Sequence, residues 1–192
     1  MHVVSQGVKP ALRKALRFGL LAFVAMSPLP AGVAYGQGAK GPRVSPHEAT
    51  SATIDGGAIT ITYGRPSMRG REIFGRLVPY GRVWCPGADE ATTLDSARPL
   101  RIGDLDVPAG PHTIWMLPTA DAWTLVVSKE PSGFHTAYDA SADLGRIEMT
   151  KRTLDAPVEQ LTFAIAADPG GHGGLLQMSW ATTEVSVPFA VQ

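Results

Sequence analysis

Hydrophobic and polar residues alternate with a period of two in several segments of this chain. In the first of them, Ile59, Ile61 and Tyr63 alternate with Thr60 and Thr62. Adjacent side chains of a β-strand point to opposite faces, so this pattern is typical of a strand with one buried face. The same pattern recurs along the chain and predicts strands at residues 57–63, 111–117, 122–129, 158–166, 174–181 and 183–190.

Turn-forming residues separate these segments. They are rich in Gly, Pro and Asp and lie at residues 55–57, 108–111, 118–121 and 168–171. Short strands at this spacing favour an all-β fold, and we expect a single-domain antiparallel β-sandwich of jelly-roll type with two packed layers. Only two segments, Arg71 to Leu77 and Ser141 to Gly145, are modest helix candidates.

The first 36 residues predict a cleaved signal peptide. A basic start from Lys9 to Arg17 is followed by the apolar run from Phe18 to Met26 and then by small residues. The apolar run is much shorter than the roughly 20 residues that span a bilayer. We therefore expect an exported protein, periplasmic or secreted, cleaved after Ala34 or Gly36, with residues 37–192 as the mature β-sandwich domain and no stable membrane insertion.

Removal of this segment would change the net charge of the protein. The whole chain has 17 basic and 17 acidic residues, but four of the basic residues precede position 36 and every acidic residue follows it. The remainder therefore carries 13 basic and 17 acidic residues, a net charge of about −4. Nucleic acid is consequently not an expected partner.

Cys85 is the only cysteine, so no intramolecular disulfide can form. Structural burial of the thiol is the favoured interpretation. A reactive thiol, with Arg82 nearby to stabilise a thiolate, and an intermolecular disulfide remain alternatives.

The most unusual segment runs from Gly64 to Leu94. It contains the tryptophan Trp84, the acidic pair Asp89-Glu90 and five arginines, which are Arg65, Arg69, Arg71, Arg76 and Arg82. Guanidinium groups pair bidentately with carboxylates or phosphates. The segment is thus either a surface loop held by internal ion pairs or the rim of a site for a polar ligand.

Several short segments of the sequence also resemble those of a known protein family. They are SPHEATSATIDGGAITITYGRP, the IFG-x-LVPYG-x-VW block, GADEATTL and the IGDLDVPAG turn. In these segments the chain resembles the bacterial domain of unknown function family 2911, from Ser45 to Phe189. The resemblance implies an exported protein and supplies no activity, substrate or cofactor. After the tryptophan the family usually has arginine and threonine, whereas this chain has Cys85 and Pro86. Before the glutamate the family usually has asparagine, whereas this chain has Asp89. A family site that depends on the missing arginine would therefore differ in this chain.

Two interpretations of the arginine-rich segment stay open. In the structural one, Arg65 and Arg71 hold the loop to Asp89, Glu90 or Asp95; the favoured pair is Arg65 with Glu90. In the functional one, Trp84 is an exposed platform for a sugar ring or an anionic metabolite. The ligand-binding candidates are then Arg65, Arg71, Arg82, Trp84 and Glu90. The other three tryptophans, at positions 115, 123 and 180, are predicted to be core residues.

Catalytic motifs are not found. The sequence has no Gly-x-Ser-x-Gly, His-Glu-x-x-His or Cys-x-x-Cys motif, and its histidines are scattered singly. Asp89 and Glu90 are adjacent, so on a strand they would point to opposite faces and would not flank one bond. No metal or cofactor is expected.

Two function classes remain. The first is a non-catalytic exported protein that binds a small polar ligand, a glycan or an envelope partner. The alternative is an envelope hydrolase that uses Glu90 with a histidine, such as His47 or His135, or with a metal. The first is favoured, and the sequence does not determine the ligand or the oligomeric state.

Overall fold

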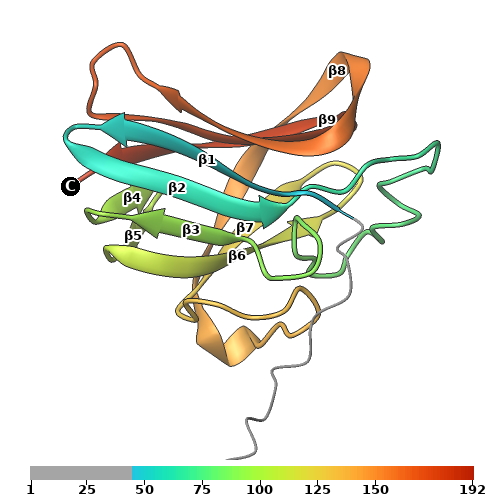
Figure 1. Cartoon of the computed structure of the whole chain (residues 1–192), viewed down its shortest axis with the longest axis horizontal. Coiled ribbons are helices and arrows are strands. Elements are labelled where there is room, and N and C mark those ends of the chain that lie inside the picture. Colours follow the sequence, from blue (N-terminus) through green and yellow to red (C-terminus); the bar gives the residue numbers. More distant parts are fainter. Residues whose placement is uncertain (1–44) are drawn as a thin grey trace, which may run out of the picture. The chain divides into compact units, whose positions relative to one another are not determined.

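The computed structural model describes residues 45–192, and these residues form one antiparallel sheet of nine strands (Figure 1). Neighbours in the sheet follow the order β1-β2-β3-β6-β7-β8-β9-β4-β5. The strands are β1 (His47–Ile54), β2 (Gly57–Gly64), β3 (Thr93–Ser96), β4 (Leu100–Ile102), β5 (Leu105–Val107), β6 (Gly110–Pro118), β7 (Trp123–Ser128), β8 (Asp143–Ala167) and β9 (Gly173–Val191).

The long strand β8 curves and carries the sheet around the core (Figure 1). It pairs with β7 up to Met149 and with β9 from Thr150 onward, and its register shifts twice between Thr153 and Thr162. Such irregularities bend a strand and increase its twist. As a result Phe163 lies across the core from β2: its ring is 4.9 Å from that of Tyr63, and its N–H donates to the Tyr63 hydroxyl at 3.2 Å.

The predicted alternation explains the main core. Ile59, Ile61 and Tyr63 of β2 are buried, and the intervening Ala58 and Thr62 are exposed. The buried side chains of β2, β8 and β9 belong to one hydrophobic cluster. Burying aliphatic and aromatic side chains of this kind contributes about 1.5–3 kcal/mol each.

Strand β6 departs from alternation because both of its faces are covered. Every residue from His112 to Met116 is buried. Trp115 belongs to a second, smaller cluster with Cys85, Ala91 and Val126. The residues that precede β3 and those that follow β7 therefore fold over the sheet here.

Three of the predicted strands are confirmed nearly to the residue, as β2, β6 and β7. The strand predicted at 158–166 corresponds only to the last part of β8. The two strands predicted at 174–181 and 183–190 form a single strand, β9, in which Ala181 has a φ of 50°. The short strands β3, β4 and β5, and also β1, were not predicted.

Both helix predictions are wrong. Residues 71–77 form successive turns, in which Gly75 has a φ of 88° and donates its N–H to the Val78 carbonyl at 2.9 Å. Ser141 to Gly145 contains only a 3-10 turn, Ala140–Ala142, before β8 begins. Residues 45–192 contain no helix long and apolar enough to cross a membrane. The predicted signal peptide lies outside the described residues.

Candidate ligand-binding cleft

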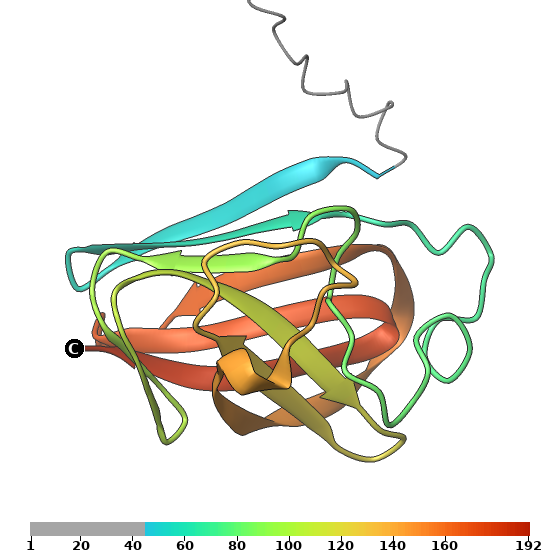
Figure 2. The ribbon, with the colours of Figure 1, turned by 90° about the horizontal axis from the view of Figure 1, so that it is seen from below.

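The arginine-rich segment is attached to the sheet at both ends (Figure 2). At its start, Leu161 donates to the Pro66 carbonyl at 3.0 Å, and Met68 donates to the Glu159 carbonyl at 2.8 Å. At its end, Trp84 exchanges two backbone hydrogen bonds of 2.8 Å with Met116 of β6. The segment is thus held between the curved part of β8 and the middle of the sheet.

Aromatic rings fill the space beneath this segment. The rings of Trp84 and Trp180 are stacked, with centroids 6.1 Å apart and planes 15° apart. Phe74 forms T-shaped pairs with Trp123 and Trp180, with ring centroids 4.8 and 6.1 Å apart. Trp180 is 1% exposed, and Trp84 is only partly buried. Such stacked and edge-to-face pairs stabilise beyond their buried area, so Trp84 has a rigid support.

A cleft of about 380 Å³ lies over these rings. Its lining residues come from the arginine-rich segment, the loop after β7, β9 and the start of the described chain: Ser45, Pro66, Ser67, Arg69, Arg71, Leu77, Val78, Trp84, Gly87, Ala88, His135 and Trp180. Among these described residues two are arginines and none is acidic. The cleft therefore combines an aromatic surface with a positive charge.

A tight turn places Arg71 at the cleft. Arg69 and Gly70 both have positive φ, 51° and 71°, as type I′ turns require, and the Arg71 N–H donates to the Met68 carbonyl at 3.0 Å. The Arg71 side chain then folds back: its Nε donates to the Met68 carbonyl at 2.9 Å and its Nη2 to the Ser67 carbonyl at 2.7 Å. No acidic side chain among the described residues binds this guanidinium, so its charge is not neutralised.

His135 is held at the cleft by the chain segment around Asp89. The Asp89 carbonyl accepts from the backbone N–H of His135 at 3.1 Å and lies 2.6 Å from its Nδ1. A carbonyl only accepts, so Nδ1 carries a hydrogen, and Nε2 is the acceptor of the neutral ring. Within the described part of the chain Nε2 has no bonding partner, which leaves it for a ligand hydroxyl.

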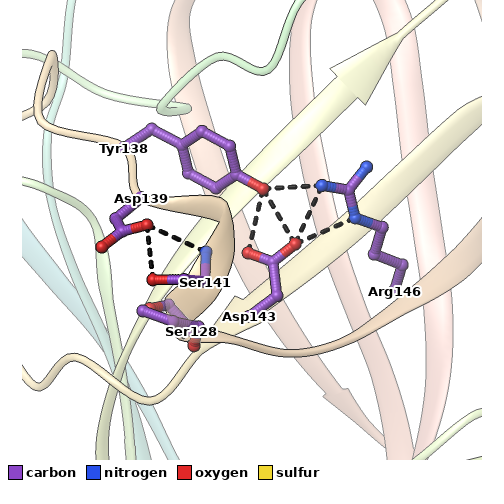
Figure 3. Close-up of polar contacts among 7 residues, drawn as sticks. Ser128, Tyr138, Asp139, Ser141, Asp143 and Arg146 are labelled. Atoms are coloured by element: carbon purple, nitrogen blue, oxygen red, sulfur yellow. Dashed lines mark hydrogen bonds and ion pairs between the residues drawn. The ribbon is translucent and has the colours of Figure 1, made fainter.

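A polar cluster orders the loop that carries His135 (Figure 3). The Tyr138 hydroxyl donates to Asp143 at 2.8 Å and accepts from Nη2 of Arg146 at 2.7 Å, while Arg146 also binds Asp143 at 2.8 Å. Burial and then Asp143 raise the pKa of Tyr138, and Asp143 raises the pKa of Arg146. Asp139 accepts from the backbone and hydroxyl of Ser141. Together these bonds fix the end of the loop to β8.

The predicted pairing of Arg65 with Glu90 is wrong. Arg65 binds Glu48 instead, with Nη1–Oε1 at 3.0 Å, and also donates to the Leu161 carbonyl at 3.1 Å and to the Thr162 hydroxyl at 3.0 Å. Strand β1 lies beside β2 and brings Glu48 to Arg65. Arg65 thus joins β1, β2 and β8 and does not line the cleft.

This arrangement predicts modest energies at Arg65. Because the side chains of Arg65 and Glu48 are 26% and 42% exposed, their coupling should be about 0.2–1 kcal/mol in a double-mutant cycle. Arg65→Ala should cost more, about 1–2 kcal/mol, since two further hydrogen bonds are lost. Urea unfolding measures both. Arg65→Ala and Glu90→Ala are the control pair and should be additive; strong coupling between them would contradict the structure.

The remaining two candidates lie apart from the cleft lining. Glu90 is next to His47, with His47 Nε2 and Glu90 Oε2 3.6 Å apart, and its backbone is bridged to Phe134. Arg82 is exposed and is not bonded to any other described residue. Of the five predicted residues, the structure therefore brings Arg71 and Trp84 together and places Arg65, Arg82 and Glu90 elsewhere.

Cys85 is a buried structural residue, as the favoured interpretation predicted. Its side chain is 1% exposed, and its sulfur accepts from the Thr92 N–H at 3.3 Å. Burial raises the pKa of the thiol to about 11. A thiol with this pKa is protonated at neutral pH, which together with its burial argues against the reactive-thiol alternative.

We expect Cys85 to resist alkylation in the folded protein. At pH 8 the thiolate should amount to about one thousandth of the molecules, because this pH lies three units below the pKa. Iodoacetamide should modify the native protein at least 100-fold more slowly than the protein in urea, as measured by intact mass. Equal rates would contradict the burial of this thiol.

The four histidines between residues 45 and 192 do not form one metal-binding cluster. His112 lies between the carbonyls of Ser128 and Pro108, at 2.9 and 3.0 Å, and His172 is exposed beside Asp55. Residues 45–192 contain no cluster of three or more His, Cys, Asp or Glu side chains placed to hold a metal ion.

Sequence reasoning missed part of the cleft. Trp180 was assigned to the core, which is correct, but it also lines the cleft. Ser67 and Arg69 were not selected, although the Arg69-Gly70 pair, with glycine at a position that favours positive φ, signals a turn. His135 was considered only as a catalytic partner for Glu90.

A comparison with protein-family models identifies the family of this chain. The model of the family "Protein of unknown function (DUF2911)" matches residues 45–189. The chain belongs to this family. The DUF2911 match includes the whole cleft and nearly all of the nine strands. No curated protein and no solved structure shows a significant similarity to the chain.

At Asp89, where the resemblance implies asparagine, the structure explains how aspartate is accommodated. Asp89 has a φ of 66°, in the left-handed region. Asn and Asp are both enriched in that conformation, so Asp in place of Asn preserves the turn. Cys85 is buried, and the Pro86 carbonyl accepts from the Thr92 hydroxyl at 2.9 Å.

Proposed function

We propose that this protein is exported and binds a small polar ligand or glycan, without catalysis, in the cleft over Trp84. The observation that carries the proposal is the combination of a supported tryptophan ring with the Arg71 guanidinium, which has no acidic partner among the described residues. A cleft of about 380 Å³ falls within the range of about 300–1,000 Å³ that is usual for small-molecule sites.

A thermal-shift screen of the mature protein tests this proposal. A ligand of the folded state raises the melting temperature, and the panel should include neutral and acidic sugars, short oligosaccharides and organic acids. Trp84→Leu should abolish the shift. Tyr80→Leu is the matched control, because Tyr80 is also an exposed aromatic residue, at 43%, but does not line the cleft. A panel without any hit, or shifts equal in both variants, would refute binding in this cleft and leave an envelope protein as the partner.

A second candidate function is hydrolysis by Glu90 with His47. The observation in its favour is their 3.6 Å contact. Against it, neither residue lines the cleft, and Nδ1 of His47 is buried. Glu90→Gln should abolish turnover of a chromogenic ester or glycoside if this candidate is correct, and no turnover by the unchanged protein would dismiss it.

The architecture that we propose is a jelly-roll-like β-sandwich formed by residues 37–192. Contacts across the core between Tyr63 of β2 and Phe163 of β8 support it. The curvature of β8, which carries one sheet around the core, supports it as well.

Export is proposed from the sequence of residues 1–36, a basic start, an apolar run and small residues. Intact-mass measurement of the protein from its native envelope should give a chain that starts near Tyr35 or Gln37. Recovery of the chain with Met1 in the cytosol would refute export.

A further inference from the structure

The lining of the cleft offers three different kinds of contact, and each restricts the chemistry of a ligand. Trp84 offers a ring surface, Arg71 a cation and His135 a ring nitrogen that accepts. None of them alone identifies a ligand. A molecule that satisfies all three needs a flat or ring-shaped apolar face, an anionic group and a hydroxyl.

Arg71 is preorganised for a carboxylate. Two of its five N–H donors are occupied by the Ser67 and Met68 carbonyls, which fix the plane of the guanidinium without neutralising it. The donors that remain can form a pair of parallel bonds to two oxygens of one carboxylate. Little side-chain freedom is then lost on binding, because the intramolecular bonds already hold the side chain.

Trp84 is suited to the C–H face of a saccharide. Its ring is stacked on Trp180 and forms a T-shaped pair with Phe74, with ring centroids 6.1 Å apart, so these two contacts hold the indole in place. Aromatic surfaces that are fixed in this way offer contact area at low entropic cost. The volume of about 380 Å³ accommodates one sugar unit rather than a long chain.

We propose that the cleft is selective for a sugar acid, a saccharide ring that carries a carboxylate, either free or as the end unit of an acidic glycan. This inference rests on the proposed function and adds the ligand class. The carboxylate pairs with Arg71, the ring lies on Trp84, and a ring hydroxyl donates to Nε2 of His135.

Isothermal titration calorimetry with glucuronate and glucose separates this inference from the proposed function. Glucuronate should bind at least 10-fold more tightly than glucose, and the difference should shrink as salt is raised. Arg71→Gln should reduce glucuronate affinity to that of glucose, whereas Arg71→Lys, which keeps the charge without the fork, should retain part of the preference. Arg82→Gln is the matched control, an exposed arginine outside the cleft, and should leave both affinities unchanged. Circular dichroism of each variant verifies its fold.

The outcomes are distinct. Equal affinities for glucose and glucuronate, or a preference that survives Arg71→Gln, would overturn the sugar-acid inference and leave ligand binding intact. Binding of acetate and inorganic phosphate as tight as that of glucuronate would overturn the role of the ring. No binding of any sugar would overturn the inference, and no hit in the wider thermal-shift panel would overturn the proposed function too. Tighter binding of a di- or trigalacturonate than of galacturonate would identify a glycan end as the source.

Discussion

Trp180→Ala is expected to lower the free energy of unfolding by about 3–5 kcal/mol, the largest effect of any substitution considered for this protein. Trp180 is 1% exposed, stacks on Trp84 and forms a T-shaped pair with Phe74. Its indole N–H also donates to the Glu159 carbonyl at 3.2 Å. The alanine variant leaves a cavity beneath the cleft, so ligand binding should be lost together with stability.

Urea unfolding, monitored by circular dichroism, measures this effect. Phe134→Ala is the control, because Phe134 is an aromatic residue that is 48% exposed and should cost less than about 1 kcal/mol. A loss below about 1.5 kcal/mol for Trp180→Ala would show that the aromatic cluster is not a tightly packed part of the core.

The second large effect is expected at Gly64, the last residue of β2. A Cβ at this position would lie 2.1 Å from the carbonyl oxygen of Ala88, a backbone atom that moves only with its whole segment. Gly64→Ala should therefore cost about 1–3 kcal/mol, as overpacking does. It should also displace Gly87 and Ala88, which line the cleft.

Gly170→Ala provides the matched control for this substitution. A Cβ there has no atom within 4 Å, and its φ lies outside the left-handed region, so the change should be neutral or slightly stabilising. Thermal unfolding of both variants, with and without a ligand found in the screen, compares the two sites. Equal stabilities would show that the segment at Ala88 yields easily.

The alternation of Ile59, Ile61 and Tyr63 was sufficient to predict β2, because one face of this strand is buried and the other is exposed. The middle of β8 was not predictable in the same way. Between Lys151 and Pro157 both faces of the strand are largely exposed, so no apolar period marks it. Strands β3, β4 and β5 have only three or four residues each, too few for a period to be recognised.

The candidate site was likewise predictable only where the sequence itself carries a signal. Trp84 and Arg71 were found because their residue types and neighbours are unusual in sequence. The partner of Arg65, Glu48, was not predicted. Glu48 reaches Arg65 because His47 of β1 pairs with Gly64 of β2, and β1 was not expected as a strand. His135 reaches the cleft only through its contact with Asp89, 46 positions away in the chain.

The pairing of β4 with β9 has a consequence for the order in which the protein folds. Leu100 and Ile102 pair with Val191 and Phe189, and the Gln192 N–H donates to the Pro99 carbonyl at 2.9 Å. The β4–β5 hairpin therefore has no neighbour in the sheet until β9 has been synthesised. Because contacts between such distant residues form slowly, we expect this edge of the sheet to form last, after the strands from β1 to β8 have paired in the order of the sheet.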